Sequence, residues 1–157
     1  MKPRIDFTKV SPRALQAMMG LQGYVNNSGL EHSLLELVKM RASQINACGY
    51  CLDMHTKDAL AAGETAQRLF LLDAWREAPF YSERERAALE WTESLTLVSE
   101  NHVPDEVYAA ARAHFSEEEL VNLSLAVVAI NGWNRLCIGF RREVGNYHVP
   151  AKARSAA

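Results

Sequence analysis

The segment 120–140, with the sequence LVNLSLAVVAINGWNRLCIGF, constrains the fold most because it is apolar on nearly every side. Its length approaches that of a membrane span. Four polar residues interrupt it: Asn122, Asn131, Asn134 and Arg135. Placing such side chains inside a lipid bilayer is energetically costly. We therefore expect a buried helix over 118–140. A helix without a polar face must be covered all round, and the sequence leaves open whether its own subunit or a second subunit covers it.

The rest of the chain shows the same helical spacing, with apolar residues three and four positions apart and no two-residue alternation of a β-strand. The sequences SERE (82–85) and SEEE (116–119) are capping boxes that each open a helix. A helix within ETAQRLFLLDAWREA should run up to Pro79, and Gly63 should end the helix before it. These signals predict an all-α fold with about seven helices.

Length and charge restrict the remaining possibilities. A chain of 157 residues predicts a single domain over 1–150, followed by a disordered tail over 151–157. With 17 Lys and Arg against 19 Asp and Glu and no basic block, neither nucleic acid nor a membrane is expected as a partner. The first residues lack the apolar run of a signal peptide, which predicts a cytoplasmic protein. In a reducing cytosol a close cysteine pair favours redox chemistry or metal binding over a structural disulfide.

The candidate site lies in the sequence ACGYCLDMHT, where two cysteines are three residues apart and a histidine follows four residues later. Asn46 and Gly49 are poor helix formers, so one helix should end and another begin beside Cys48. Cys51 would then lie in a first helical turn, where free N–H groups and the helix dipole favour a thiolate. His55 lies one turn further on the same face and is placed to exchange a proton with that sulfur.

Glu36 is the candidate partner for the His55 ring. It lies ten residues before Asn46, and His55 lies eight residues beyond Ala47, which gives helical arms of about 15 Å and about 12 Å. If the two helices fold back as an antiparallel hairpin, Glu36 and His55 reach similar depth. In one continuous helix they would be about 28 Å apart. The sequence therefore predicts a central hairpin in which the Glu36 carboxylate reaches the His55 ring directly or through one water.

A metal site is the main alternative for these residues. Cys48, Cys51 and His55 are three possible ligands, and Cys137 or His32 is a possible fourth. A second close pair of the zinc-ligand type is absent from the sequence. Thioredoxin-like proteins carry the same dithiol on a strand–helix unit, and no strand pattern is present. Cys137, within the most apolar helix, is predicted to be an inert core thiol.

The stretch ELVKMRASQINACGYCLDMHTKDALAAGE (36–64) resembles the core of the carboxymuconolactone decarboxylase superfamily, in its alkylhydroperoxidase D-like branch. That branch has a glutamate, eleven residues, Cys-x-x-Cys, three residues and a histidine, which here fall on Glu36, Cys48, Cys51 and His55. The sequence NGWNRLCIGFR (131–141) is similar to the asparagine-rich closing helix of these proteins. The opening IDFTKVSPRALQAMMGL is similar to the leader helix of many small members.

The resemblance implies an all-helical subunit that assembles into homo-oligomers, typically trimers or hexamers built from dimers. It also implies a peroxidase in which Cys51 attacks a hydroperoxide and becomes a sulfenic acid. Cys48 then forms a disulfide with it, an external dithiol or protein reductant restores both thiols, and His55 and Glu36 relay the proton. Neither a metal nor an organic cofactor is implied. Tyr50 replaces a second histidine that the best-known members carry between the cysteines, and tyrosine is a poor base near neutral pH.

Two other functions remain open from the sequence. One is a general thiol-disulfide oxidoreductase with weak peroxidase activity, and the other is a metal-binding helical oligomer. The true carboxymuconolactone decarboxylases of the superfamily lack the dithiol, so decarboxylation is disfavoured.

Overall fold

The computed structural model describes residues 2–150, and this part of the chain is entirely helical, as the sequence predicts. The helices are α1 (Phe7–Val10), α2 (Pro12–Asn26), α3 (His32–Ile45), α4 (Gly49–Ala61), α5 (Ala66–Leu71), the 3-10 turn η1 (Leu72–Ala74), α6 (Glu83–Thr96), α7 (Val98–Asn101), α8 (Asp105–His114) and α9 (Glu117–Phe140). The tail predicted over 151–157 lies outside the described residues.

Local sequence signals explain most helix boundaries. Both predicted capping boxes are present, at Ser82 before α6 and at Ser116 before α9. Gly63 follows α4 with φ of +94°, a left-handed conformation that glycine adopts without strain. The helix expected to reach Pro79 ends earlier, at Leu71, and continues as η1. The guanidinium group of Arg86 donates hydrogen bonds to backbone carbonyls of the 75–78 segment, which takes the place of helical partners there.

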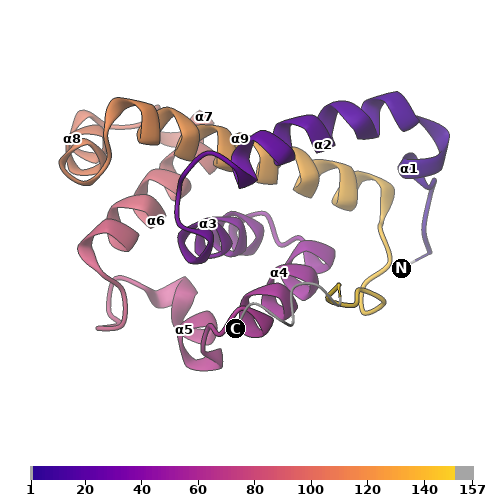
Figure 1. Ribbon diagram of the computed structural model, residues 1–157, viewed down its shortest axis with the longest axis horizontal. Helices are drawn as coiled ribbons and strands as arrows, with labels where there is room; N and C mark the ends of the chain where they lie inside the picture. The colour runs from indigo at the N-terminus through magenta and orange to yellow at the C-terminus, as the bar shows by residue number, and fades with distance from the viewer. Residues whose placement is uncertain (1, 151–157) are drawn as a thin grey trace.

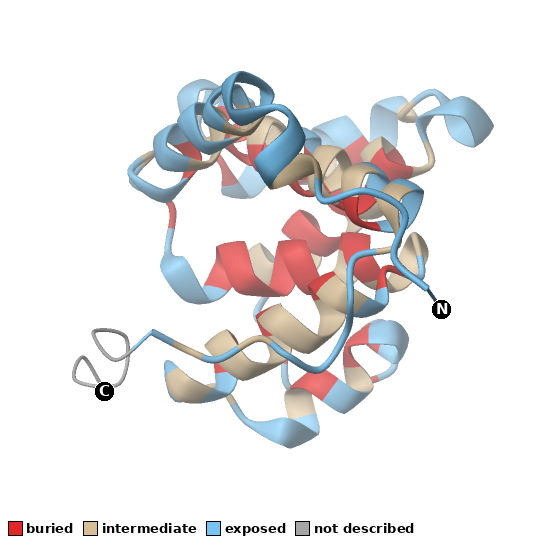
Figure 2. Ribbon diagram, turned by 90° about the vertical axis from the view of Figure 1, so that its right-hand side faces the viewer, coloured by how far each residue is buried: buried red, intermediate tan, exposed pale blue. Residues whose placement is uncertain are grey.

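The core is arranged around α3, which packs against α4, α6 and α9. Figure 1 shows α2 and α9 running side by side, with α3 and α4 below them. Residues 34–40 of α3 are buried without interruption, including the charged residues Glu36 and Lys39. The buried segments gather in the interior of the helical packing (Figure 2). This central helix therefore carries charge inside the protein, which requires partners for both side chains.

The apolar helix α9 is only partly covered by its own subunit. It is long and apolar enough to cross a membrane by length and composition, but it packs against α2, α3 and α6 in the helical core. Three large apolar side chains on it stay exposed: Val121, Val128 and Ile138. The sequence predicts a helix that is covered on every side. Within this subunit, only the inner face of α9 is covered.

Candidate active site

The corner between α3 and α4 places the cysteine pair. Asn46 is the C-cap of α3, and Cys48 is the N-cap of α4. Between them Ala47 has φ of 52°, a left-handed conformation that costs a non-glycine residue about 1 kcal/mol. The Cys48 N–H donates to the Ser43 carbonyl at 2.9 Å, which closes the turn. The chain breaks where the sequence predicts, but Ala47 and not Gly49 adopts the left-handed conformation, and Gly49 begins α4.

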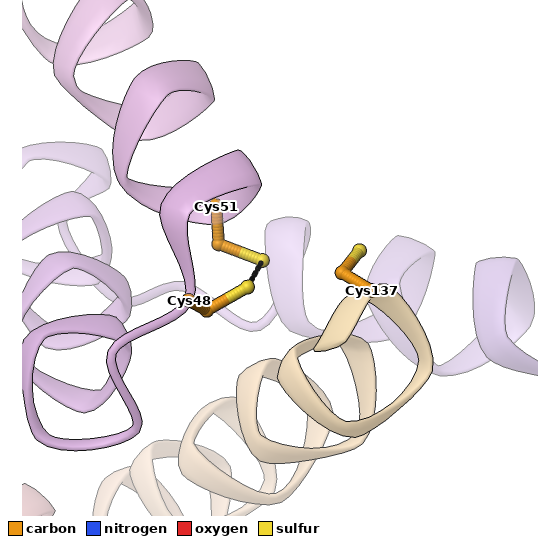
Figure 3. A group of neighbouring side chains, drawn as sticks. All are labelled: Cys48, Cys51 and Cys137. Atoms are coloured by element: carbon orange, nitrogen blue, oxygen red, sulfur yellow. Dashed lines mark hydrogen bonds between the residues drawn. The ribbon is translucent and has the colours of Figure 1, made fainter. Parts of the chain in front are cut away.

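The two sulfur atoms of the pair are in direct contact. Cys48 Sγ and Cys51 Sγ lie 2.9 Å apart, and both residues are 1% exposed. Both are free thiols. Figure 3 shows the Cys51 side chain on the first turn of α4, with its sulfur beside that of Cys48. Two thiols at this separation need little movement to form a disulfide bond of about 2.05 Å.

Cys137 joins this pair, so the prediction of an inert core thiol is incomplete. It extends from α9 toward the other two sulfurs (Figure 3), and all three Sγ atoms lie within 4.8 Å of one another. All three cysteines are buried. We call Cys48, Cys51 and Cys137 the thiol cluster. Spacing within the sequence does not reveal this contact, because it depends on how α9 packs against the corner.

Asparagine side chains fix α9 against the corner. Asn46 Nδ2 donates to Asn131 Oδ1 at 3.0 Å and to Asn134 Oδ1 at 2.9 Å. Asn134, fully buried, donates in turn to the Ser43 hydroxyl at 3.1 Å. Cys137 lies three residues after Asn134, so the two side chains lie on the same face of α9. The asparagine network therefore positions the Cys137 thiol beside Cys48 and Cys51. The asparagine-rich helix noted in the sequence thus has a structural role at the site.

The thiol cluster favours one negative charge, on Cys48. Interaction with the thiols of Cys137 and Cys51 lowers the pKa of Cys48 to about 3. The same kind of contact, with Cys137 and Cys48, raises the pKa of Cys51, and burial raises it further. Contact with the Cys48 sulfur raises the pKa of Cys137 to about 12. The expectation of a lowered pKa at Cys51 is therefore wrong for the reduced site, because the neighbouring sulfur at the N-cap competes for the charge.

One turn along α4, His55 meets Glu36 as the sequence predicts. His55 Nδ1 lies 3.0 Å from Glu36 Oε2, and both residues are buried. Lys39 Nζ donates to Glu36 Oε1 at 2.8 Å and is buried with it. Burial alone would raise the pKa of Glu36, but hydrogen bonding and attraction from His55 and Lys39 outweigh it and lower the pKa to about 2. Glu36 is therefore an ionised carboxylate at neutral pH.

The sequence interpretation did not place Lys39 or His32 beside Glu36. Lysine side chains are mostly exposed in folded proteins, yet Lys39 is buried against Glu36. His32 Nε2 lies 3.9 Å from Glu36 Oε1 on the more exposed side. The i,i+3 and i,i+4 spacing of these residues relative to Glu36 is the signal that could have identified both.

A cavity of about 740 Å³ opens beside this charged group. Its lining includes Glu36, His32, Asp58, Arg68, Glu85 and Tyr147. The thiol cluster, in contrast, is covered by α9. His55 makes no hydrogen bond to a sulfur within residues 2–150, so direct proton exchange between His55 and Cys51 has no hydrogen bond to follow in this structure.

The last described residues pass along α4. The Arg142 guanidinium lies over the Tyr50 ring at 4.2 Å, and the Gly145 N–H donates to Asp53 Oδ2 at 3.3 Å. Further along, the Tyr147 hydroxyl donates to Asp58 at 2.7 Å. Burial raises the pKa of Tyr50, so the residue between the cysteines is a neutral hydrogen-bond donor and not a base.

The structure does not bring together the set of metal ligands that the sequence suggested. Among residues 2–150, the thiol cluster is the one group of potential metal ligands whose donor atoms lie together. Neither His55 nor His32 belongs to it, because both face Glu36. Three sulfurs fall one short of the four ligands that a structural zinc site requires.

Comparison with known proteins gives both a family and close structural matches. The profile of the carboxymuconolactone decarboxylase family matches residues 12–94. The chain is 44% identical over 138 residues to the uncharacterized protein YdfG of Bacillus subtilis, covering 88% of this chain and 94% of YdfG. It is 45% identical, with a TM-score of 0.90, to a protein of unknown function from Agrobacterium tumefaciens that is named as a candidate antioxidant defence protein AhpD, covering 93% and 100% of the two chains.

A more distant match concerns the fold alone. The debrominase Bmp8 shares 19% identity with a TM-score of 0.79, and the match covers 95% of this chain and 77% of Bmp8. The helical packing and the dithiol at a helix start define an alkylhydroperoxidase D-like protein. The chain belongs to the carboxymuconolactone decarboxylase family.

Proposed function

We propose that this protein is a cysteine-based peroxidase that reduces hydroperoxides through a Cys48–Cys51 dithiol/disulfide cycle. The observation that carries the proposal is the 2.9 Å contact between two free, buried sulfurs, with an ionised carboxylate–histidine pair one turn away. The antioxidant name of the structural relative at 45% identity supports the same chemistry.

The proposed cycle begins with a thiolate. The Cys51 thiol gives its proton through one water molecule to His55 Nε2, which makes Cys51 the attacking thiolate. The Cys51 thiolate attacks the outer oxygen of the hydroperoxide, the O–O bond breaks, and the departing alkoxide takes the proton back from the His55 imidazolium through the same water and leaves as an alcohol. Cys51 becomes a sulfenic acid. The Cys48 thiolate then attacks the Cys51 sulfur, the S–O bond breaks, and the released hydroxide takes a proton from solvent and leaves as water. An external dithiol or protein reductant reduces the disulfide without a metal or organic cofactor.

Glu36 and His55 act in this cycle as a proton relay. The ionised carboxylate favours the imidazole tautomer with hydrogen on Nδ1, which leaves Nε2 free to accept a proton. Because His55 forms no hydrogen bond with a sulfur in the described residues, we propose that one water molecule connects Nε2 with Cys51. The cavity beside Glu36 lets protons exchange with solvent at the other end of the relay.

Assembly and location complete the proposal. The exposed apolar residues Val121, Val128 and Ile138 on α9 favour a homo-oligomer. We propose a trimer or hexamer, as the family resemblance implies, and a cytoplasmic location. Size exclusion with light scattering measures the subunit count. A single-subunit mass would contradict this part of the proposal.

The oxidant preference tests the proposed activity. Stopped-flow loss of free thiol should be faster with cumene hydroperoxide than with a small disulfide at equal concentration. The reverse order would identify a general thiol-disulfide oxidoreductase and overturn the peroxidase proposal. A screen with lipoamide, thioredoxin and glutathione then identifies which reductant restores the thiols.

A further inference from the structure

Cys137 has no part in the cycle above, although its thiol lies beside both reacting sulfurs. Its Sγ atom is within 4.8 Å of Cys48 Sγ and Cys51 Sγ, and the residue is buried with them. Figure 3 shows the Cys137 side chain on α9, across from the dithiol. A thiol that served only to pack the core would not require this position against two reactive sulfurs.

We propose that Cys137 is a second resolving thiol, which forms a Cys51–Cys137 disulfide when Cys48 cannot react. The inference rests on the proposed peroxidase chemistry, because it needs a sulfenic acid on Cys51. In the intact site Cys48 lies closer, at 2.9 Å, and reacts first. Where Cys48 cannot react, Cys137 protects Cys51 from a second peroxide molecule, which would convert the sulfenic acid to an irreversible sulfinic acid.

The step balances without another co-reactant. A hydroperoxide oxidises Cys51 by two electrons and leaves as an alcohol. The Cys137 sulfur bonds to Cys51 Sγ, the S–O bond of the sulfenic acid breaks, and the hydroxide takes the Cys137 proton and leaves as water. Cys137 carries that proton in the reduced site, since contact with the Cys48 sulfur keeps its pKa high.

The asparagine network prepares Cys137 for this reaction. Asn46 lies in the same corner as Cys48 and donates hydrogen bonds to Asn131 and Asn134 of α9. The distance from Cys137 to the dithiol is therefore set by the same contacts that join the helices. The Sγ atoms of Cys51 and Cys137 lie within 4.8 Å of each other, so a shift of α9 or α4 must bring them to the disulfide length of about 2.05 Å.

The test compares Cys48→Ser with the double variant Cys48→Ser/Cys137→Ser. Each is treated with one equivalent of cumene hydroperoxide, then with dimedone, and is mapped by peptide mass spectrometry. We expect Cys48→Ser to yield a dimedone-resistant Cys51–Cys137 cross-link within one chain. The double variant should instead carry dimedone on Cys51. Excess peroxide should give sulfinic acid at Cys51 in the double variant and far less of it in Cys48→Ser.

Dimedone labelling of Cys51 in Cys48→Ser to the same extent as in the double variant would overturn the role of Cys137. If instead the proposed peroxidase function is wrong, neither variant will consume peroxide and neither will carry the dimedone label. Circular dichroism checks the fold of both variants, and Cys48→Ala provides a second background without a hydroxyl group. The cross-link must appear in at least one of these backgrounds for the inference to hold.

Discussion

At the start of α4 three thiols lie together under α9, whereas one turn further along the same helix His55 lies against a carboxylate and an ammonium group of α3. The first region holds sulfur without a carboxylate or imidazole in contact. The second, formed by Glu36, Lys39 and His55, borders a cavity of about 740 Å³. We refer to them as the thiol end and the charged end of the site.

The difference indicates that the two ends of the site serve different steps of the proposed cycle. The thiol end is shielded from solvent, which suits sulfur oxidation states that water and excess oxidant would degrade. The charged end is open to exchange of protons through the cavity. Because His55 contacts Glu36 and no sulfur in the described residues, substitutions at the two ends should give separable effects on activity, pH dependence and stability.

The largest effect is expected at the thiol end. Cys51→Ser should abolish hydroperoxide consumption, because serine cannot be oxidised to a sulfenic acid by peroxide. Stability should change little, since the two side chains have similar shape. Peroxide loss measured with a ferrous dye assay, together with thermal unfolding, checks both statements. Residual turnover close to that of the unmodified protein would show that the attacking sulfur is not Cys51.

At the charged end, Glu36→Gln should reduce stability more than any substitution at the thiol end. It leaves the buried Lys39 ammonium group without its ion-pair partner, and breaking a buried pair typically costs about 3–5 kcal/mol. Urea unfolding measures the loss. The matched control is Glu36→Gln/Lys39→Met, which removes both charges and should recover much of the stability. A double variant no more stable than the single one would contradict this explanation.

The acid dependence of stability provides a further test of the charged end. The pKa of Glu36 falls from 4.5 to about 2 on folding, which corresponds to about 3 kcal/mol. This contribution is fully present above pH 4.5 and is lost as the pH falls through about 2. The stability difference between the unmodified protein and Glu36→Gln should therefore narrow on acidification. A constant difference from pH 6 to pH 2 would show that Glu36 is not held ionised by its partners.

His55→Asn should change kinetics more than stability. Without the imidazole acceptor, the Cys51 thiol must lose its proton to solvent, so the pH-rate profile should shift to higher pH. Loss of a general base commonly costs on the order of a hundredfold in rate, and we expect that size near pH 7. An unchanged profile would remove His55 from the mechanism and leave the two ends of the site independent.

The sequence could predict features that depend on helix geometry alone. The capping boxes, the end of α4 at Gly63 and the Glu36–His55 contact follow from local spacing and from two arms of similar length. Features that depend on packing between distant segments were missed. Cys137 meets the dithiol because asparagines fix α9, and Lys39 is buried because other helices surround α3.

The pKa of Cys51 was predicted with the wrong sign for a related reason. Helix dipole arguments consider one sulfur at a helix start, whereas three sulfurs share this position and Cys48 takes the charge. Likewise α5 ends early because Arg86, from α6, binds the carbonyls of the following segment. In both cases side chains outside the local signal change its outcome: the other two sulfurs of the thiol cluster at Cys51, and Arg86 at the end of α5.

Peptide mapping of the unmodified protein after one equivalent of hydroperoxide tests the central claim most directly. We expect a disulfide between Cys48 and Cys51 in each chain, with Cys137 still free, and full recovery of all three thiols after treatment with a dithiol. If all three cysteines stay reduced while peroxide remains in solution, the dithiol is not a peroxide-reducing site.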